Sequence, residues 1–253
     1  MPEIRAPRLC VLIDADNVPA GHAEAIFEEI SGLGEASVRR IYGDWSSPRL
    51  AGWAKKVNTL GMVADQQFSN TKGKNASDIG LVIAAMDFLH SGLFDAFVLV
   101  SSDSDFTRLA SRIREQGLDV FGIGEKKTPE AFRNACKRFI YVENLGGVEP
   151  APAEPMAPGI PASLPPETAE QANARAKLSP ASAIPIIVAA MKRIGLEEDW
   201  YTLGQLGQFI TLSHPDFDTR TYGAAKLSDL LKKTGRFEVK QGPTGNLIVR
   251  DLA

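Results

Sequence analysis

Hydrophobic residues before position 147 fall into short apolar runs that alternate with amphipathic stretches. A run of four to eight apolar residues is typical of a buried strand, and apolar residues at helical spacing are typical of an amphipathic helix. Strands alternating with helices predict a parallel sheet covered by helices on both faces. We therefore expect an α/β fold with strands at Leu9–Ile13, Ser37–Tyr42, Met62–Phe68, Phe97–Val100, Val120–Ile123 and Phe139–Val142.

The helices between these runs have recognisable ends. Ser47 and Thr128 are capping residues followed by proline, a pair that favours the start of a helix. Another helix is expected from about Asp105 to Gln116, where a glycine ends it. The helix beginning near Ser77 has an apolar stripe at helical spacing that we expect to face the core: Ile79, Val82, Ile83, Met86 and Leu89.

A change in composition divides the chain. Residues 147–180 contain half of the 16 prolines, many alanines and no aromatic residue, which is typical of a disordered linker. It separates a domain at 1–146 from a domain at 181–253. The second domain shows three helical patterns and a terminal hairpin, which predict a small α+β winged-helix module: Ala181–Ile194, Thr202–Leu212, Thr219–Thr234, Arg236–Lys240 and Asn246–Arg250.

Composition excludes some classes of protein. The net charge of −3 argues against a protein that holds nucleic acid by bulk charge, although a local basic surface stays open. Cys10 and Cys136 are too few and too far apart for a disulfide framework or a thiolate metal site. The N-terminus shows no signal-peptide pattern and no apolar run is long enough to cross a membrane, so we expect a cytoplasmic protein.

Acidic residues gather where strands are expected to end. The sequence LCVLIDADN places Asp14 and Asp16 after the first strand, and FVLVSSDSDF places Asp103 and Asp105 after the fourth. Asp78 lies in the first turn of the helix that precedes the fourth strand. Parallel sheets bind ligands at the carboxyl ends of their strands, where strand order reverses. If the first and fourth strands are neighbours, these aspartates converge.

Crowded carboxylates repel one another, and a hard divalent cation such as Mg²⁺ or Mn²⁺ relieves that repulsion. Such ions polarise phosphoryl groups and activate water, which suits phosphodiester cleavage. A plainer interpretation also stays open, since Asp16 and Asn17 would serve equally well to begin the first helix. A haloacid-dehalogenase-like phosphatase is a further alternative, but Asn17 stands where its motif expects Thr or Val.

The first domain resembles the NYN family of PIN-like nuclease domains, in particular its LabA-like branch. The resemblance rests on VLIDADNVP, GKNASDIGLVIAAMDFLHSG, FVLVSSDSDFTRLASRIREQGLDVFGIGEKKTPEAF and FIYVENL, which span nearly all of residues 8–145. It implies a PIN-like fold and a metal-dependent ribonuclease whose catalytic, metal-binding acids are Asp14, Asp78, Asp103 and Asp105. It also implies a supporting or substrate contact for Asn17, and contacts to water or phosphate for Ser101 and Ser102.

The C-terminal domain resembles the OST-HTH, or LOTUS, winged-helix module, through IPIIVAAMKRIGLEEDWYTLGQLGQFI and HPDFDTRTYGAAKLSDLLKKTGRFEV. This resemblance implies RNA binding or recruitment of a protein partner; Tyr222 is a candidate for base stacking. Near the acids, Lys74 and Arg108 are candidate phosphate contacts. We therefore expect a two-domain ribonuclease. The alternative is an RNA-binding regulator with little or no turnover, and a homo-oligomer stays open.

Overall fold

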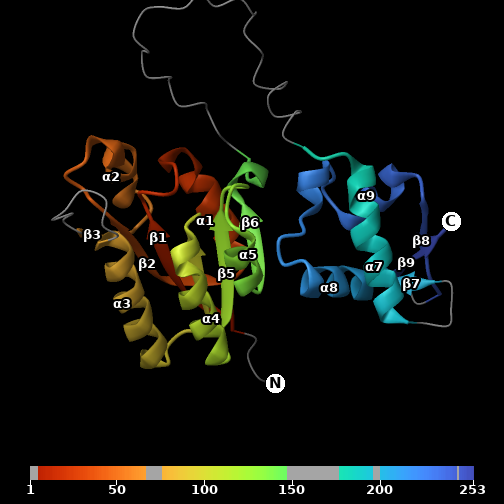
Figure 1. The fold of residues 1–253 in the computed structure, drawn as a ribbon, viewed down its shortest axis with the longest axis horizontal. Helices are drawn as coiled ribbons and strands as arrows, with labels where there is room; N and C mark the ends of the chain where they lie inside the picture. Colours follow the sequence, from red (N-terminus) through yellow and green to blue (C-terminus); the bar gives the residue numbers. More distant parts are fainter. Residues whose placement is uncertain (1–4, 67–75, 147–176, 196–199, 244) are drawn as a thin grey trace, which may run out of the picture. The chain divides into compact units, whose positions relative to one another are not determined.

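The computed structural model describes residues 5–66, 76–146, 177–195, 200–243 and 245–253. The chain divides into two compact units, Met1–Ala153 and Glu154–Ala253 (Figure 1). No helix in the described ranges is both long and apolar enough to cross a lipid bilayer.

The first unit is built around one parallel sheet. Within the described residues its strands are β1 (Arg8–Asp14), β2 (Glu35–Gly43), β3 (Val63–Gln66), β4 (Ala96–Val100), β5 (Asp119–Gly124) and β6 (Arg138–Tyr141). They lie in the order β3-β2-β1-β4-β5-β6. The main helices are α1 (Ala23–Ser31), α2 (Ala51–Val57), α3 (Ala76–Ser91), α4 (Thr107–Glu115) and α5 (Glu130–Ala135). Single 3-10 turns are η1 (Ala20–His22), η2 (Pro48–Leu50), η3 (Ser104–Phe106) and η4 (Val142–Asn144).

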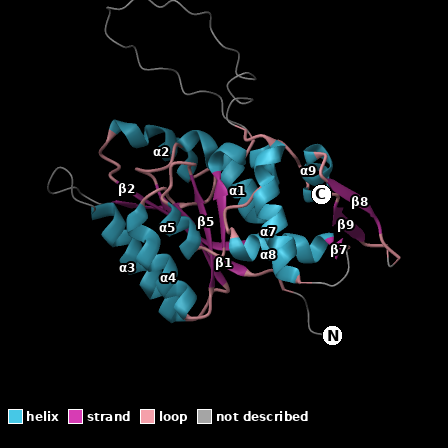
Figure 2. Ribbon diagram, turned by 45° about the vertical axis from the view of Figure 1, so that its right-hand side comes forward, coloured by secondary structure: helices cyan, strands magenta, loops and turns pink. Residues whose placement is uncertain are grey.

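Helices cover both faces of the sheet (Figure 2). Alternate residues of β1 point to opposite faces, so Val11 packs with α1 and α2 while Leu12 packs with α3, α4 and α5. Both cysteines are free and fully buried on the second of these faces, as expected of small apolar residues. The α/β fold with a parallel sheet and helices on both sides is thus confirmed.

The strand order places β1 beside β4. The chain runs outward from β1 through β2 to β3, and then returns through α3 to β4 on the other side of β1. Ile13 of β1 pairs with Val100 of β4, so the residues that follow both strands emerge at the same edge. The expectation that the first and fourth strands are neighbours is confirmed. This edge, at the reversal of strand order, is where open parallel sheets bind their ligands.

The expected inner face of α3 is partly wrong. Leu81, Ala85 and Leu89 are buried, whereas Ile79 and Ile83 are 62% and 58% exposed. Leu89 belongs to the predicted stripe, and Val82 and Met86 pack partly buried against the same core, whereas Leu81 and Ala85 were not predicted. Since α3 is apolar on most of its surface, periodicity alone does not say which stripe faces the sheet.

The second unit combines three helices with a small antiparallel sheet. Its described elements are η5 (Pro180–Ala183), α7 (Ile184–Ile194), β7 (Tyr201–Thr202), α8 (Leu203–Ser213), η6 (Thr219–Tyr222), α9 (Leu227–Thr234), β8 (Phe237–Gln241) and β9 (Leu247–Asp251). The strands lie in the order β7-β9-β8. The expected small α+β module is confirmed in outline, with three differences in detail.

First, the helix expected over Thr219–Thr234 is broken into η6 and α9, because Gly223 adopts a left-handed φ of 71°. Second, β7 was not predicted, since two residues are too short for a recognisable pattern. Third, Tyr222 is only 8% exposed and packs 5.5 Å from the ring of Phe217, so it is a core residue and offers no face for stacking. The expected linker at 147–180 lies mostly outside the described residues, and the domain boundaries stay predictions.

Candidate metal centre

Three carboxylates meet at the carboxyl edge of the sheet. Asp78 lies in the first turn of α3, Asp103 follows β4, and Asp105 lies in η3. One oxygen of each lies within 4.8 Å of the other two. They converge because Asp103 and Asp105 both follow β4 and because α3 contacts η3. The arrangement places three hard oxygen donors where one cation could contact them all.

Asp103 also has a local structural role. Its Oδ1 accepts a hydrogen bond of 2.9 Å from the backbone N–H of Asp105, which caps η3. This bond holds the strand end in the conformation that presents both carboxylates. Capping and metal binding are therefore compatible at this residue, because a carboxylate has about four acceptor positions.

Asp14 is buried behind this cluster, at 1% exposure. Its Oδ2 accepts hydrogen bonds from Asn17 Nδ2 at 2.7 Å and from Ser101 Oγ at 2.8 Å. Its Oδ1 accepts a hydrogen bond of 3.2 Å from the backbone N–H of Asp16. Burial raises the pKa of Asp14, and the bonds from Asn17 and Ser101 lower it in part. Asp14 therefore adds a fourth, buried carboxylate whose charge acts on Asp78.

The electrostatic cost of this arrangement appears at Asp78. Burial, followed by repulsion from Asp14, Asp103 and Asp105, raises the pKa of Asp78 to about 6. A divalent cation would offset this repulsion, and an all-oxygen donor set is the one preferred by Mg²⁺ and Mn²⁺. The residues present therefore fit such an ion.

The two predicted serines are engaged inside the protein. Ser101 Oγ donates to Asp14 and accepts a 3.0 Å hydrogen bond from the backbone N–H of Asp103, so it links two of the acids. Ser102 Oγ accepts a 2.9 Å hydrogen bond from the backbone N–H of Glu125, which ties the end of β4 to the end of β5. Both hydroxyls order the loops that present the carboxylates.

The predicted cations are only partly placed. Arg108 is exposed in the first turn of α4, close in sequence to Asp105. Lys74, predicted to contact phosphate, lies outside the described residues, as does its neighbour Lys72. The three histidines belong to η1, the last turn of α3 and the end of α8.

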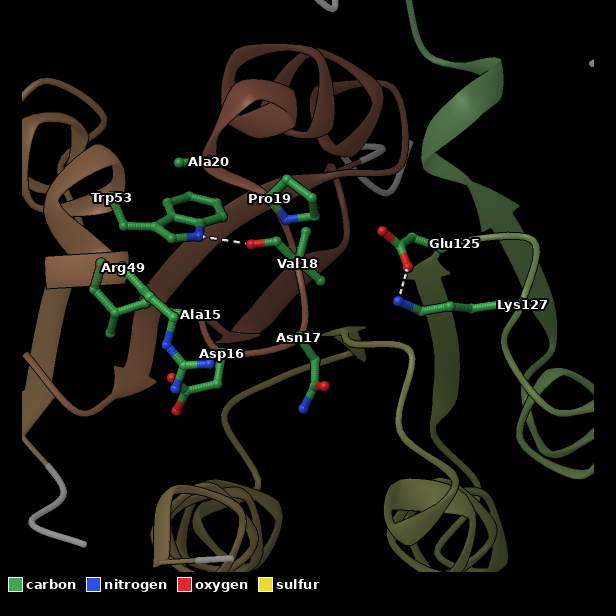
Figure 3. A pocket seen from close by; sticks show the side chains of 11 residues that line it. Ala15, Asp16, Asn17, Val18, Pro19, Ala20, Arg49, Trp53, Glu125 and Lys127 are labelled. Atoms are coloured by element: carbon green, nitrogen blue, oxygen red, sulfur yellow. Dashed lines mark hydrogen bonds and ion pairs between the residues drawn. The ribbon is translucent and has the colours of Figure 1, made fainter. Parts of the chain in front are cut away.

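A pocket of about 250 Å³ opens beside the acids, and sequence reasoning missed it. It is formed by the loop after β1, by η2 and α2, and by the loop after β5 (Figure 3). The indole Nε1 of Trp53 donates a 2.8 Å hydrogen bond to the carbonyl of Val18, which fixes the loop against α2. Ser47, predicted to cap a helix after the second strand, indicated a structured loop here. Only the strand order shows that this loop and the loop after β5 reach the same edge.

Comparison with known proteins agrees with the fold and the two-domain organisation. The model of the NYN domain matches residues 8–143, and the model of the OST-HTH/LOTUS domain matches residues 181–249. No curated protein matches the chain significantly.

Two solved structures are similar to parts of the chain. One is a protein of unknown function from Vibrio parahaemolyticus, 18% identical with a TM-score of 0.48, covering 56% of this chain and 96% of its own. The other is an uncharacterized protein of Nitrosomonas europaea, 29% identical with a TM-score of 0.26, covering 40% and 91%. The family assignment rests on the domain models: this chain belongs to the NYN domain family and carries a C-terminal OST-HTH/LOTUS domain.

Proposed function

We propose that the protein is a metal-dependent ribonuclease in which Asp78, Asp103 and Asp105 hold Mg²⁺ or Mn²⁺ above Asp14. The observation that carries the proposal is the approach of three carboxylates to within 4.8 Å, beside a fourth that is buried. NYN domains are nuclease-like as a family, which supports cleavage of a phosphodiester bond. The OST-HTH/LOTUS domain supports RNA as the substrate, with recruitment of a protein partner as its other use.

The bound ion would polarise the scissile phosphate and lower the pKa of the attacking water. The chain's own residues supply position and charge. Ser101 holds the Asp14 carboxylate and the backbone of Asp103 in one hydrogen-bonded unit, and Asn17 fixes the same carboxylate from the other strand end. We therefore assign Ser101 and Asn17 as positioning residues for the acids. Arg108, exposed in the first turn of α4 two residues after η3, is the proposed contact to a phosphate of the bound strand.

The test is cleavage of end-labelled RNA in Mn²⁺ or Mg²⁺ by the wild type, Asp14→Asn and Asp103→Asn. We expect each variant to lose at least about a hundredfold in rate, because each removes charge that positions or binds the cation. Asp119→Asn is the matched control, since Asp119 pairs with Lys137 at 2.6 Å at the start of β5. Binding of Mn²⁺, followed by electron paramagnetic resonance, should weaken in Asp103→Asn and stay unchanged in Asp119→Asn. Equal cleavage by wild type and both site variants would exclude the assigned centre.

A second function is favoured by one observation. The Asp14 carboxylate accepts three hydrogen bonds within the protein, so its oxygens are already engaged by Asn17, Ser101 and the backbone of Asp16. The protein would then be an RNA-binding regulator with little or no turnover. Tight RNA binding by the wild type, with no metal-dependent cleavage, would support this alternative.

A further inference from the structure

The pocket beside the loop after β1, which we call the Trp53 pocket, shares that loop with Asp14, the last residue of β1. It is lined by Ala15, Asp16, Asn17, Val18, Pro19, Ala20, Arg49, Leu50, Trp53, Glu125 and Lys127. Asn17 belongs to both places, because it lines the pocket and donates its amide hydrogen to Asp14. Asp16 also lines the pocket, and its charge acts on Asp78. The pocket and the acids are therefore linked through the loop that carries Asp16 and Asn17.

The size and lining of the pocket suit one nucleotide. At about 250 Å³ it falls just below the range of about 300–1,000 Å³ that takes whole small molecules. Its wall includes apolar groups of Val18, Pro19, Ala20 and Leu50, against which a flat base can pack. Asn17 and Asp16 add hydrogen-bonding groups at the same site. Such a recess admits a base only when it is unstacked and unpaired, which is how proteins read single-stranded RNA.

Cations stand on opposite sides of the pocket. Figure 3 shows Arg49 and Trp53 on one side, with Glu125 and Lys127 on the other and the loop after β1 between them. Arg49 is exposed, and Lys127 pairs with Glu125 while 73% of its side chain stays accessible. A polyanion is attracted by positive charge, and these two side chains supply it at the pocket.

We propose that the Trp53 pocket binds an unpaired nucleotide of the RNA strand next to the scissile phosphate, with Arg49 and Lys127 contacting the phosphates on either side of it. The inference rests on the proposed ribonuclease function and specifies its substrate as single-stranded RNA. Trp53 is a positioning residue in this arrangement, since its indole is buried and holds the loop after β1 in place.

The test measures binding without cleavage. The full-length Asp103→Asn protein is titrated against a fluorescein-labelled single-stranded RNA, and anisotropy is recorded across a range of salt concentrations. In this background, Arg49→Ala and Lys127→Ala should each weaken binding about three- to tenfold at low salt and reduce the salt slope by about 0.7. Arg5→Ala and Lys137→Ala are matched controls, because both side chains are exposed ion-pair partners at the amino ends of the strands.

A steric variant separates the pocket from its charges. Ala20→Phe fills the pocket without changing its charge. This variant should bind single-stranded RNA more weakly, while its binding of duplex RNA stays unchanged. The same RNA containing 4-thiouridine should crosslink to the loop after β1, to η2 or to the loop after β5. Thermal unfolding of each variant checks that the fold is kept.

The outcomes separate this inference from the proposed function. If Arg49→Ala, Lys127→Ala and Ala20→Phe all bind as the parent does, or if crosslinks fall only in residues 177–253, the pocket assignment is overturned even where the wild type cleaves RNA. If these variants lose affinity while the wild type cleaves nothing in Mn²⁺, the pocket assignment holds and the nuclease proposal fails.

Discussion

The charged carboxylate of Asp78 suits metal binding but lowers the stability of the metal-free protein. Its pKa rises from 3.8 to about 6, mainly through burial and then through repulsion by the other acids. The folded state therefore holds the Asp78 proton more tightly than the unfolded state does. The stability that this proton contributes is complete below about pH 4 and is lost as the pH rises through about 6.

We predict that Asp78→Asn stabilises the metal-free protein at pH 7.5 by about 1 kcal/mol, or about 2–4 °C in the melting temperature. This figure is smaller than the full shift implies, because the side chain is partly solvated and screened. At pH 4 the gain should disappear. Thermal unfolding in EDTA at the two pH values measures both effects. Adding Mn²⁺ should stabilise the wild type more than the variant, and a variant that is less stable than the wild type at pH 7.5 in EDTA would contradict the prediction.

Gly124 lets two strand ends approach closely. A Cβ atom placed there would lie 2.4 Å from the carbonyl oxygen of Ser101, which is backbone and cannot move freely. We predict that Gly124→Ala destabilises the protein by about 1–3 kcal/mol and weakens Mn²⁺ binding, because Ser101 also holds Asp14.

Chemical denaturation and manganese titration measure the two effects of Gly124→Ala. Gly21→Ala is the matched control, since a Cβ at Gly21 meets no atom within 4 Å. Equal stability and equal Mn²⁺ affinity for Gly124→Ala and the wild type would show that the strand ends adapt without cost.

Among the elements, α3 shows how far a hydrophobic pattern determines packing. Leu81 is buried against the sheet, and Ile83 is 58% exposed two residues later. We predict that Leu81→Ala destabilises the protein by about 2–5 kcal/mol, because it leaves a cavity, while Ile83→Ala changes stability by less than about 0.5 kcal/mol. Urea unfolding of both variants tests the difference. Similar losses for the two would mean that α3 is rotated relative to the sheet from the orientation described.

Sequence patterns predicted the elements of the first unit better than their contacts. The strands were located because fully buried parallel strands are continuous apolar runs, as β1 and β4 are. The acids were located because each D-x-D pair follows such a run. The buried face of α3 was located only in part, because α3 is apolar on most of its surface: Leu89 is buried as predicted, but Ile79 and Ile83 are exposed. The Trp53 pocket was not predicted from the sequence. Its residues Arg49 and Lys127 are 78 positions apart in the chain (127 − 49), and only the strand order brings them to the same pocket.

At the scale of the whole molecule, the two units have separate cores. The second unit has its own buried cluster, which includes Ile187, Leu206 and Leu230. Several of its arginines are neutralised by close acidic partners: Arg220–Asp218, Arg236–Asp251 and Arg250–Glu238, at 2.7, 2.7 and 2.6 Å. Arginines held in this way are less available to phosphates, so we expect weak and salt-sensitive RNA binding by this unit alone.

A more specific contact in the second unit is available at Trp200. The ammonium of Lys240 lies 3.7 Å from the centre of the Trp200 ring, and the guanidinium of Arg250 lies 4.8 Å from it. Arg250 is held by Glu238, but Lys240 is exposed, and an aromatic ring beside such a cation is a combination that binds single-stranded nucleic acid. We predict that Trp200→Ala in the full chain weakens RNA binding several-fold, about 1 kcal/mol, and leaves the rate of cleavage at saturating RNA unchanged. Lys192→Ala, a change to another cation of the same unit, is the control in the same anisotropy and cleavage assays.

Two weak binding units on one chain act more strongly than either alone, because binding by the first raises the local concentration of RNA at the second. We therefore predict that a fragment of residues 1–146 keeps the metal-dependent kcat of the full chain while its KM rises about tenfold. A fragment of residues 177–253 should bind RNA without cleaving it. Steady-state cleavage with the two fragments, alone and mixed, measures these effects; mixing should not restore the low KM, since the units are then no longer joined. If the fragment 1–146 matches the KM of the full chain, the second unit does not hold the substrate, and recruitment of a protein partner becomes its better explanation.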